Sequence, residues 1–306
     1  MLGHEPIEKF LATLQAQQDF SENTLAAYRN DLGQFAEFLG TGQGSGRSSL
    51  QQPANWGQVT REHIVAFLLY LRERRYANTT VARKQAAIKS FFKFLTSHGL
   101  VSSNPVENLA APHVDRALPH TIDASEVGRL LHEMYVAPGT PETLRDRAMM
   151  QLLYATGLRV GETVALNVDD IGEAGTAVSI VSRGKTRGVR ITDRASIEAL
   201  RDYLQEGRPR IAHGEGRSED DNRALFLNHR GQRLTRQGFW LILKRYAKLA
   251  GLDEISPHTL RHSFAAQKLK GGANMHDLQQ ILGHANISTT QVYGRIEQQK
   301  ETKGRR

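Results

Sequence analysis

The chain has 306 residues, which at roughly 150 residues per domain is enough for about two domains with cores of their own. It contains no cysteine, which excludes disulfide frameworks, thiolate zinc sites, iron–sulfur clusters and cysteine nucleophiles. An apolar content of 39% and a charged content of 24% are typical of a soluble globular protein, and no apolar run approaches the length of a membrane span. The composition and the amino terminus, which has no signal-peptide pattern, predict a cytoplasmic protein.

The charge balance is basic. Forty Lys and Arg residues stand against 32 Asp and Glu residues, which leaves a formal charge of +8. An excess of this sign suits a partner with a phosphate backbone. From charge alone, a protein that binds nucleic acid and a basic protein without such a partner are equally plausible interpretations.

Residues 5–98 show a purely helical pattern with four amphipathic segments. Ser21 is a good N-cap for the second segment, whose apolar stripe includes Leu25, Leu32 and Phe35. Two further helices follow Thr60 and Asn78, and the last ends near residues 98–99. Four such helices predict a small bundle over residues 1–104.

Residues 105–121 are rich in proline and have no sustained period, so they predict an interdomain linker. Asp123 and Glu126 form a capping-box pattern at the start of a second domain over residues 122–306. This domain is mainly helical with two short β runs, 177–181 and 189–192, joined by the basic turn SRGKTRG. Its later helices are predicted near residues 194–206, 235–250, 257–270, 274–282 and 287–296, with stops at Gly207, Gly251 and Gly283. The fold class is therefore mostly α with a small β-sheet.

The string SPHTLRHSFA at residues 256–265 carries the first sign of chemistry. Pro257 suits the first turn of a helix, on which His258 and Arg261 project from one face at i and i+3. A group that exchanges protons and a permanent cation then stand side by side. Taken alone, such a pair is more often part of a solvated helix surface.

Other segments add to this pair. The segment TGLRVGE places Arg159 just after a helix-stopping glycine, where backbone N–H groups also attract anions. His284 follows a second glycine stop, and Tyr293 lies nine residues further on. This combination resembles the catalytic domain of the tyrosine site-specific recombinases, the phage-integrase family, and most closely its Xer type.

The resemblance spans nearly the whole chain. It implies that the amino-terminal bundle is the family's four-helix, SAM-like core-binding domain and that the remainder is the tyrosine recombinase catalytic domain. It also implies that the catalytic residues are Arg159, Lys185, His258, Arg261, His284 and Tyr293, with Tyr293 as the nucleophile of a 3′-phosphotyrosyl intermediate.

The residue types suit phosphoryl transfer on physical grounds as well. Two guanidinium groups, Arg159 and Arg261, can clamp the non-bridging oxygens of a phosphodiester without losing their protons. A tyrosine hydroxyl with an ordinary pKa near 10 needs a proton acceptor and a cationic field, and His258 is the candidate acceptor.

The leaving 5′ oxygen needs a proton, and the basic turn supplies Lys185 as the candidate acid. In family members a lysine in this hairpin is followed five residues later by an arginine, which Lys185 and Arg190 reproduce. The turn departs from the commoner glycine-lysine-glycine pattern, so Arg183 remains an alternative register. We favour Lys185 because only a lysine releases its proton near neutral pH.

Two site residues and the DNA contacts have competing interpretations. Glu162 matches an acidic position that the family uses to orient the first arginine, but it also fits an ordinary exposed helical glutamate. His284 is expected to bond a phosphate oxygen or merely to cap a helix. The candidate DNA-binding residues, which also fit a solvated surface, are Arg83, Lys89, Lys93, Arg183, Arg187 and Arg190.

No cofactor is predicted. His258 and His262 have the spacing of two zinc ligands on a helix, but the glutamate of HExxH is replaced by Thr259, so a metal site is not supported. GKT at residues 184–186 lacks the upstream glycine of a phosphate-binding loop, with Ser179 in its place. A phosphotyrosyl bond also conserves the energy of the phosphodiester, which removes the need for ATP or a metal.

The sequence therefore predicts an enzyme that cuts and rejoins double-stranded DNA at specific sites, with chromosome or plasmid dimer resolution as its Xer-like role. The alternatives are a mobile-element integrase, a type IB topoisomerase and a non-catalytic DNA-binding accessory protein. The resemblance implies a homo- or hetero-tetramer on two DNA sites, with or without a second recombinase, in the cytoplasm at the nucleoid. The polar tail EQQKETKGRR has no apolar residue to bury in a neighbour and is expected to contact DNA or stay disordered.

Overall fold

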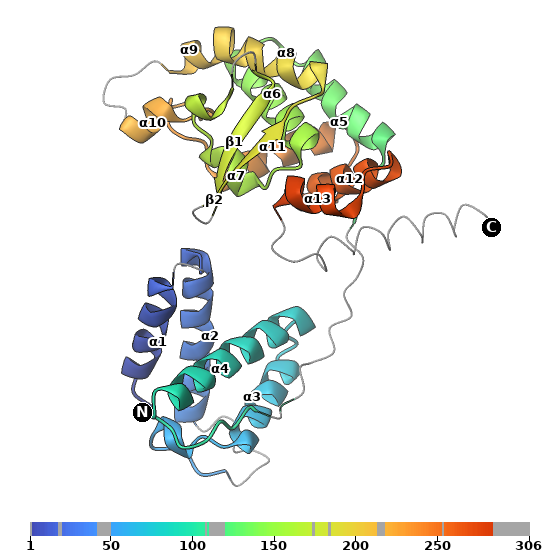
Figure 1. The fold of residues 1–306 in the computed structure, drawn as a ribbon. Coiled ribbons are helices and arrows are strands. Elements are labelled where there is room, and N and C mark those ends of the chain that lie inside the picture. Colours follow the sequence, from blue (N-terminus) through green and yellow to red (C-terminus); the bar gives the residue numbers. More distant parts are fainter. Residues whose placement is uncertain are drawn as a thin grey trace, which may run out of the picture. The chain divides into compact units, whose positions relative to one another are not determined.

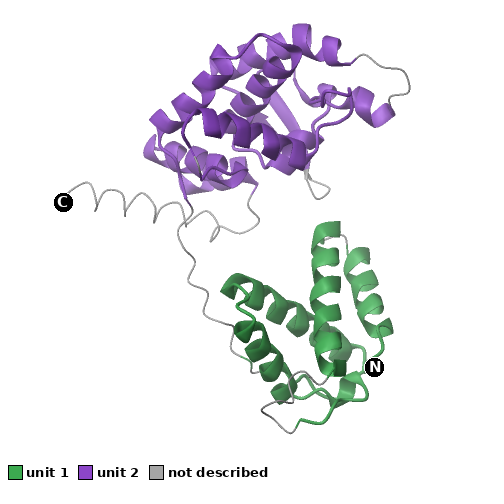
Figure 2. Ribbon diagram, turned by 180° about the vertical axis from the view of Figure 1, so that it is seen from behind, with its two compact units in different colours: residues 1–116 green, residues 117–306 purple. Residues whose placement is uncertain are grey.

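The structure is a computed structural model that describes residues 2–17, 20–41, 50–107, 109, 120–172, 175–182, 185–212, 218–252 and 254–283. The chain divides into two compact units, Met1–Arg116 and Ala117–Arg306 (Figure 2). The division falls within the predicted linker, 105–121, most of which lies outside the described residues. The linker and the domain limits around it therefore stay predictions.

The described residues of unit 1 form four α-helices, as the apolar stripes predict (Figure 1). They are α1 (Glu5–Ala16), α2 (Glu22–Thr41), α3 (Arg61–Glu73) and α4 (Asn78–Ser97), with a short 3₁₀ turn at Trp56–Gln58. Their apolar faces meet in an aromatic core, where the Trp56 ring packs edge-on against Phe91 with centroids 4.9 Å apart. Aromatic packing of this kind buries a large area per residue and holds a small bundle together.

In unit 2 the part of the chain that the structure describes has more helices, arranged around a two-stranded sheet (Figure 1). Its first elements are α5 (Ala124–Val136), α6 (Pro141–Thr156), α7 (Val160–Ala165), β1 (Ala177–Ser182) and β2 (Lys185–Arg190). They are followed by α8 (Arg194–Asp202), α9 (Arg208–Ile211), α10 (Glu219–Arg223), α11 (Arg236–Leu249), α12 (Pro257–Lys270) and α13 (Met275–Leu282). Helix α6 is buried along most of its length and packs against α5, α8 and α12, so it forms the centre of this unit.

Two local predictions are confirmed at the ends of these helices. Asp123 caps α5, since its carboxylate accepts from the Glu126 backbone N–H while Glu126 accepts from the Asp123 N–H. Gly251 and Gly283 both adopt the left-handed conformation just after a helix, with φ of +66° and +61°.

The predicted limits of the second strand are wrong. The strand β2 begins at Lys185, four residues before the predicted start, and pairs antiparallel with β1 from Ser182↔Lys185 to Ala177↔Arg190. The basic segment therefore belongs mostly to the strand, and only residues 183–184 separate the two strands. Composition suggested a long turn, whereas cross-strand hydrogen bonding decides where a strand begins.

Gly207 is not a helix stop, which corrects another prediction. The chain passes from α8 through a π-helical turn, Tyr203–Gly207, directly into α9. A Cβ at Gly207 would lie 2.9 Å from the Tyr203 ring and 3.1 Å from the Cβ of Leu144. This glycine therefore allows close packing against α6 rather than a turn.

Candidate active site

Arg159 lies at the junction between α6 and α7. The helix α6 ends at Gly157, which has φ +63°, and a Cβ there would lie 2.4 Å from the Phe264 ring on α12. Glycine is thus required both by the backbone conformation and by the approach of α12. Two residues later Arg159 is the N-cap of α7, as the sequence predicts.

Glu162 lies in the first turn of α7 and binds Arg159 twice. Its Oε2 accepts from the Arg159 backbone N–H at 2.8 Å, and its Oε1 accepts from Arg159 Nη1 at 3.0 Å. Only 8% of the Glu162 side chain is exposed, whereas 42% of the Arg159 side chain is. Glu162 is therefore not an ordinary exposed helical glutamate, and its contacts are those of a residue that orients Arg159.

A second arginine reaches the same carboxylate from the sheet. Arg187 on β2 donates from Nη1 to Glu162 Oε1 at 2.9 Å and from Nη2 to Oε2 at 3.0 Å. This parallel pair of bonds is the bidentate geometry that gives arginine–carboxylate pairs their strength and direction. Arg187, a candidate DNA contact by sequence, thus points towards the protein interior here.

Arg261 on α12 is the third arginine near Glu162, and we call Arg159, Arg187 and Arg261 the arginine cluster. Its side chain is almost fully buried, with Nη1 donating to the Gly157 carbonyl and Nη2 to the Leu282 carbonyl, each at 2.5 Å. Its Nη1 also lies 3.9 Å from Glu162 Oε2. The two arginines predicted as a phosphate clamp are thereby brought to one carboxylate from two different helices.

The same two arginines hold the end of α13. Arg261 binds the carbonyl of Leu282, and Arg159 Nη2 donates to the carbonyl of Gly283 at 3.2 Å. These are the last carbonyls before His284, which lies outside the described residues. The arginine cluster therefore anchors the backbone directly next to a predicted catalytic histidine.

The electrostatics of the cluster favour an anion. Burial by itself would raise the pKa of the Glu162 carboxyl, but hydrogen bonds and charge from Arg187 and Arg159 outweigh it and hold the pKa below its usual value. Glu162 is therefore ionised at neutral pH and offsets one of the three guanidinium charges that surround it. The remaining positive charge can stabilise a phosphoryl group that gains negative charge in a transition state.

The two histidines of α12 differ in exposure. His258 is exposed, whereas His262 is partly buried. The exposure of His258 suits its predicted contact with a substrate. Burial, with help from the neighbouring charges of His258 and Arg261, lowers the pKa of His262 to about 4. Their rings lie 6.4 Å apart, and the described part of the chain has no group of three His, Asp or Glu side chains arranged for a metal ion.

Several predicted residues cannot be placed. His284, Tyr293 and Arg183 lie outside the described residues. Lys185 is described only as the first residue of β2, opposite Ser182. Arg190 ends the same strand and is exposed.

Comparison with known proteins identifies the family. Residues 120–300 match the phage integrase family, and residues 7–99 match the phage integrase N-terminal SAM-like domain. The chain belongs to the phage integrase family. It is therefore a tyrosine recombinase, an enzyme that breaks and rejoins DNA, and the predicted membership and fold class are confirmed.

Relatives agree with this membership, and a solved structure has the same fold. The chain is 48% identical over 291 residues to tyrosine recombinase XerC of Roseiflexus castenholzii (strain DSM 13941 / HLO8), covering 95% of this chain and 88% of the relative. It is 38% identical over 291 residues to tyrosine recombinase XerD of Listeria monocytogenes serotype 4b (strain F2365), covering 95% and 93%. The XerH recombinase bound to a palindromic difH substrate has the same fold, with a TM-score of 0.72 and 18% identity over 98% of this chain and 94% of that one.

Unit 1 of this phage-integrase family member carries its candidate DNA contacts on α4. Lys89 and Lys93 are exposed, as their place opposite the apolar stripe predicts. Arg83 is 44% exposed and donates to Asp31, a carboxylate that is fully buried on α2. Lys84 binds the other oxygen of Asp31 at 2.8 Å.

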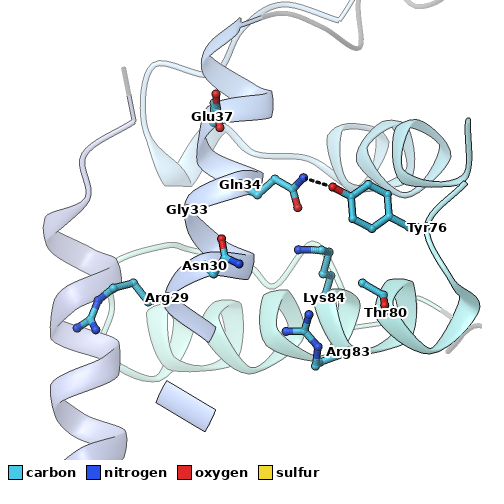
Figure 3. A pocket seen from close by; sticks show the side chains of 9 residues that line it. All are labelled: Arg29, Asn30, Gly33, Gln34, Glu37, Tyr76, Thr80, Arg83 and Lys84. Atoms are coloured by element: carbon cyan, nitrogen blue, oxygen red, sulfur yellow. Dashed lines mark hydrogen bonds between the residues drawn. The ribbon is translucent and has the colours of Figure 1, made fainter. Parts of the chain in front are cut away.

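Arg83 and Lys84 border an open pocket of about 560 Å³ between α2 and α4 (Figure 3). It is lined by Arg29, Asn30, Gly33, Gln34, Glu37, Tyr76, Thr80, Arg83 and Lys84. Asp31 and Lys84 were not among the residues predicted from the sequence. The signal that could have found them is a charge in an apolar register, because Lys84 precedes Ile88 by four residues on the buried face of α4.

Among the described residues no helix is long and apolar enough to cross a membrane.

Proposed function

We propose that this protein is a site-specific recombinase of the Xer type that resolves chromosome or plasmid dimers through a 3′-phosphotyrosyl intermediate. The observation that carries the proposal is the meeting of Arg159 and Arg261 at Glu162, within a family of tyrosine recombinases. The names of the relatives, XerC and XerD, support the Xer-type role.

In the proposed reaction Arg159 and Arg261 bind the non-bridging oxygens of the scissile phosphate. Both remain protonated, so they stabilise the charge that builds up as a fifth oxygen approaches phosphorus. Glu162 accepts hydrogen bonds from both the side chain and the backbone N–H of Arg159. This reduces the reorganisation of Arg159 that is needed when the phosphate binds. His284 adds a hydrogen bond to a phosphate oxygen.

The Oη of Tyr293 attacks phosphorus and the P–O5′ bond breaks, so the DNA 3′ phosphate becomes bonded to Tyr293 and a 5′ hydroxyl is released. His258 accepts the phenolic proton, and Lys185 donates a proton to the leaving 5′ oxygen. Rejoining reverses these steps with the 5′ hydroxyl of the exchanged strand. No external energy source is needed, since one phosphodiester bond is traded for another, and no cofactor is assigned.

The proposed partner is double-stranded DNA carrying specific recombination sites, bound in the cytoplasm at the nucleoid. Arg83, Lys89 and Lys93 of α4 contact the phosphate backbone, with Arg190 and Arg183 as further candidates at the hairpin. Two sites are held together by four protomers, all copies of this chain or pairs with a second recombinase.

A nicked DNA substrate that traps the covalent intermediate tests the catalytic proposal. The wild-type protein should form a complex that survives denaturant, and Tyr293→Phe, which retains the ring and removes the oxygen, should not. Equal behaviour of the two proteins would reject Tyr293 as the nucleophile. If neither protein forms the complex while both bind the site, the chain acts as a non-catalytic accessory protein.

Recovery of genomic fragments bound by the protein, followed by mapping of the cleaved position, tests the Xer-type role. A single chromosomal site, or a site on a multicopy plasmid, is expected for dimer resolution. Cleavage at the ends of a mobile element would instead identify an integrase. Relaxation of supercoils without any site preference would indicate a type IB topoisomerase.

A further inference from the structure

Arg187 has contacts that a surface DNA-binding residue would not need. Only 19% of its side chain is exposed, and both of its terminal nitrogens are committed to Glu162. Its Nε is buried and has no hydrogen-bond partner among the described residues. The side chain is therefore held by its two-pronged bond to one carboxylate.

That bond links the hairpin to the arginine cluster. Arg187 pairs with Ile180 in the middle of the antiparallel ladder and lies two residues after Lys185 on β2. Glu162, its acceptor, lies in the first turn of α7 and also binds Arg159. A single carboxylate thus fixes the strand that begins at Lys185 with respect to the helix that Arg159 caps.

A second contact limits the movement of Arg187. A Cβ at Gly283 would lie 2.5 Å from Arg187 Nη1 and 2.8 Å from its Cζ. The guanidinium group is therefore packed against the backbone at the end of α13, whose last carbonyl accepts from Arg159. Three segments, β2, α7 and the end of α13, meet at Arg187.

The charges explain why an arginine is suited to this place. Glu162 by itself would offset one of the two guanidinium groups proposed to bind phosphate. Arg187 neutralises Glu162, so that the charges of Arg159 and Arg261 remain for the phosphate. A lysine would restore the charge but could not make two parallel bonds of fixed direction.

We propose that Arg187 is a positioning residue that holds the β1–β2 hairpin in register with the arginine cluster, so that the acid on the hairpin reaches the leaving oxygen. The inference rests on the proposed function, in which Lys185 is that acid. Arg187 acts through Glu162 and the strand, and it does not contact the reacting atoms.

The test compares two DNA substrates that differ only at the scissile bond. One has the normal 5′ oxygen, and the other has a 5′-bridging sulfur in its place. A thiolate leaves without protonation because its conjugate acid is far stronger than an alcohol, so the sulfur substrate does not need the acid. A defect in the delivery of the proton slows cleavage of the oxygen substrate alone.

Arg187→Met removes the guanidinium and keeps an apolar stem. We expect it to slow cleavage of the oxygen substrate by about 100-fold more than cleavage of the sulfur substrate, since a small misplacement of a catalytic group costs about that much. The sulfur substrate also slows, because Glu162 then offsets one of the charges proposed to bind phosphate. Arg187→Lys, which keeps a cation against Glu162 and guards against loss of folding, should show the same pattern with a smaller defect. Arg194→Met is the matched control, because Arg194 is 91% exposed in an ion pair with Glu198 and its loss changes the net charge equally.

Equal slowing of both substrates by Arg187→Met and Arg187→Lys would overturn the inference, because Arg187 would then act on the phosphate or on the fold. Lys185→Ala separates this failure from that of the proposed function. If sulfur rescues Lys185→Ala but not the Arg187 variants, only the inference is wrong. If sulfur does not rescue Lys185→Ala, Lys185 is not the acid and the inference is wrong as well.

Discussion

Two buried carboxylates among the described residues of unit 2 are bound by arginines, and their pKa values shift in opposite directions. Glu162 receives a two-pronged bond from Arg187 and further bonds from Arg159, and its pKa is lowered. Asp146 on α6 receives bonds from Arg145 and Arg245, and its pKa is raised. Burial is the largest influence on both carboxyl groups.

The difference follows from how far each carboxylate is removed from water. Asp146 is fully buried, and this burial outweighs the bonds from Arg145 and Arg245 and the Tyr246 hydroxyl. Arg145 also donates to the Leu227 carbonyl at 2.9 Å, so the Asp146 cluster joins α6 to neighbouring backbone and to α11. We infer that this cluster serves the fold.

Both clusters reach solvent through one arginine, since 42% of the Arg159 side chain and 57% of the Arg245 side chain are exposed. The three guanidinium groups around Glu162 exceed its carboxylate by two charges, against one at Asp146, and this larger excess suits the binding of an anion. Composition alone would not separate the two clusters, since both are arginines around an acid. The number of arginines separates them, three around Glu162 and two around Asp146, and so does the carboxylate itself, which is fully buried at Asp146 and 8% exposed at Glu162.

The largest expected effect on stability is at the Asp146 cluster. Arg145→Ala should lower the free energy of unfolding by about 3–5 kcal/mol, because it leaves a buried carboxylate without its main partner. Urea unfolding followed by circular dichroism measures the change. Arg194→Ala, which breaks an exposed pair, should cost less than about 1 kcal/mol. A loss of similar size in the two variants would contradict a structural role for the Asp146 cluster.

Arg159→Ala should reduce the rate of cleavage strongly and the stability of the fold only slightly. We expect the rate of covalent-complex formation on a nicked substrate to fall by about 100- to 1000-fold, as for the loss of one preorganised donor to a transition state. The unfolding free energy should change by less than about 1 kcal/mol, because the side chain is partly exposed and Glu162 keeps Arg187. A large loss of stability with unchanged cleavage by the folded protein would place Arg159 in the same class as Arg145.

Gly283→Ala tests the packing of Arg187 against the end of α13, and its expected effect is of intermediate size. Alanine at φ +61° costs about 1–2 kcal/mol in any protein, and here its Cβ would also lie 2.5 Å from Arg187 Nη1. Gly251→Ala is the matched control, since Gly251 has φ +66° and nothing within 4 Å of an added Cβ. Gly283→Ala should therefore unfold more readily than Gly251→Ala, and it alone should slow cleavage, by about tenfold or more. Identical behaviour of the two variants would show that the contact with Arg187 is unimportant.

The smallest expected effect is a pH dependence of stability that arises from His262, the residue after Arg261 on α12. The pKa of His262 is about 4 in the folded protein, against the ordinary histidine value of 6.5 that applies to the unfolded chain, so the unfolded state binds more protons between these values. Stability should therefore fall as the pH is lowered from about 6.5 to about 4. His262→Gln should flatten this part of the curve of urea midpoint against pH. An unchanged slope would show that His262 is not buried as a neutral group.

The local structure of the site was largely predictable from the sequence. Gly157, Pro257 and Gly283 are strong local signals, because backbone conformation at a helix end depends on few neighbours. They correctly predicted that Arg159 begins a helix, that His258 and Arg261 share α12, and that α13 ends just before His284. The chemical need for two permanent cations also pointed to Arg159 and Arg261.

The errors arise where distant residues decide the outcome. The strand β2 contains Lys185, Arg187 and Gly188, which suggest a turn, yet pairing with β1 makes them a strand. Gly207 looks like a stop, yet it lies inside a continuous helical segment because α6 packs closely against it. In each case a contact with a segment far away in the chain outweighs the local preference.

The sequence by itself determined the helical bundle of unit 1, the mainly helical unit 2 and the family, because periodicity, caps and the order of a few chemical groups are local properties. Only the tertiary structure decided which charges meet. Arg187 and Glu162 are 25 residues apart in the chain, and Arg261 and Gly157 are 104 apart. No local rule relates such residues, since their distance in space is set by the packing of α6, α7, α12 and the hairpin around a common core.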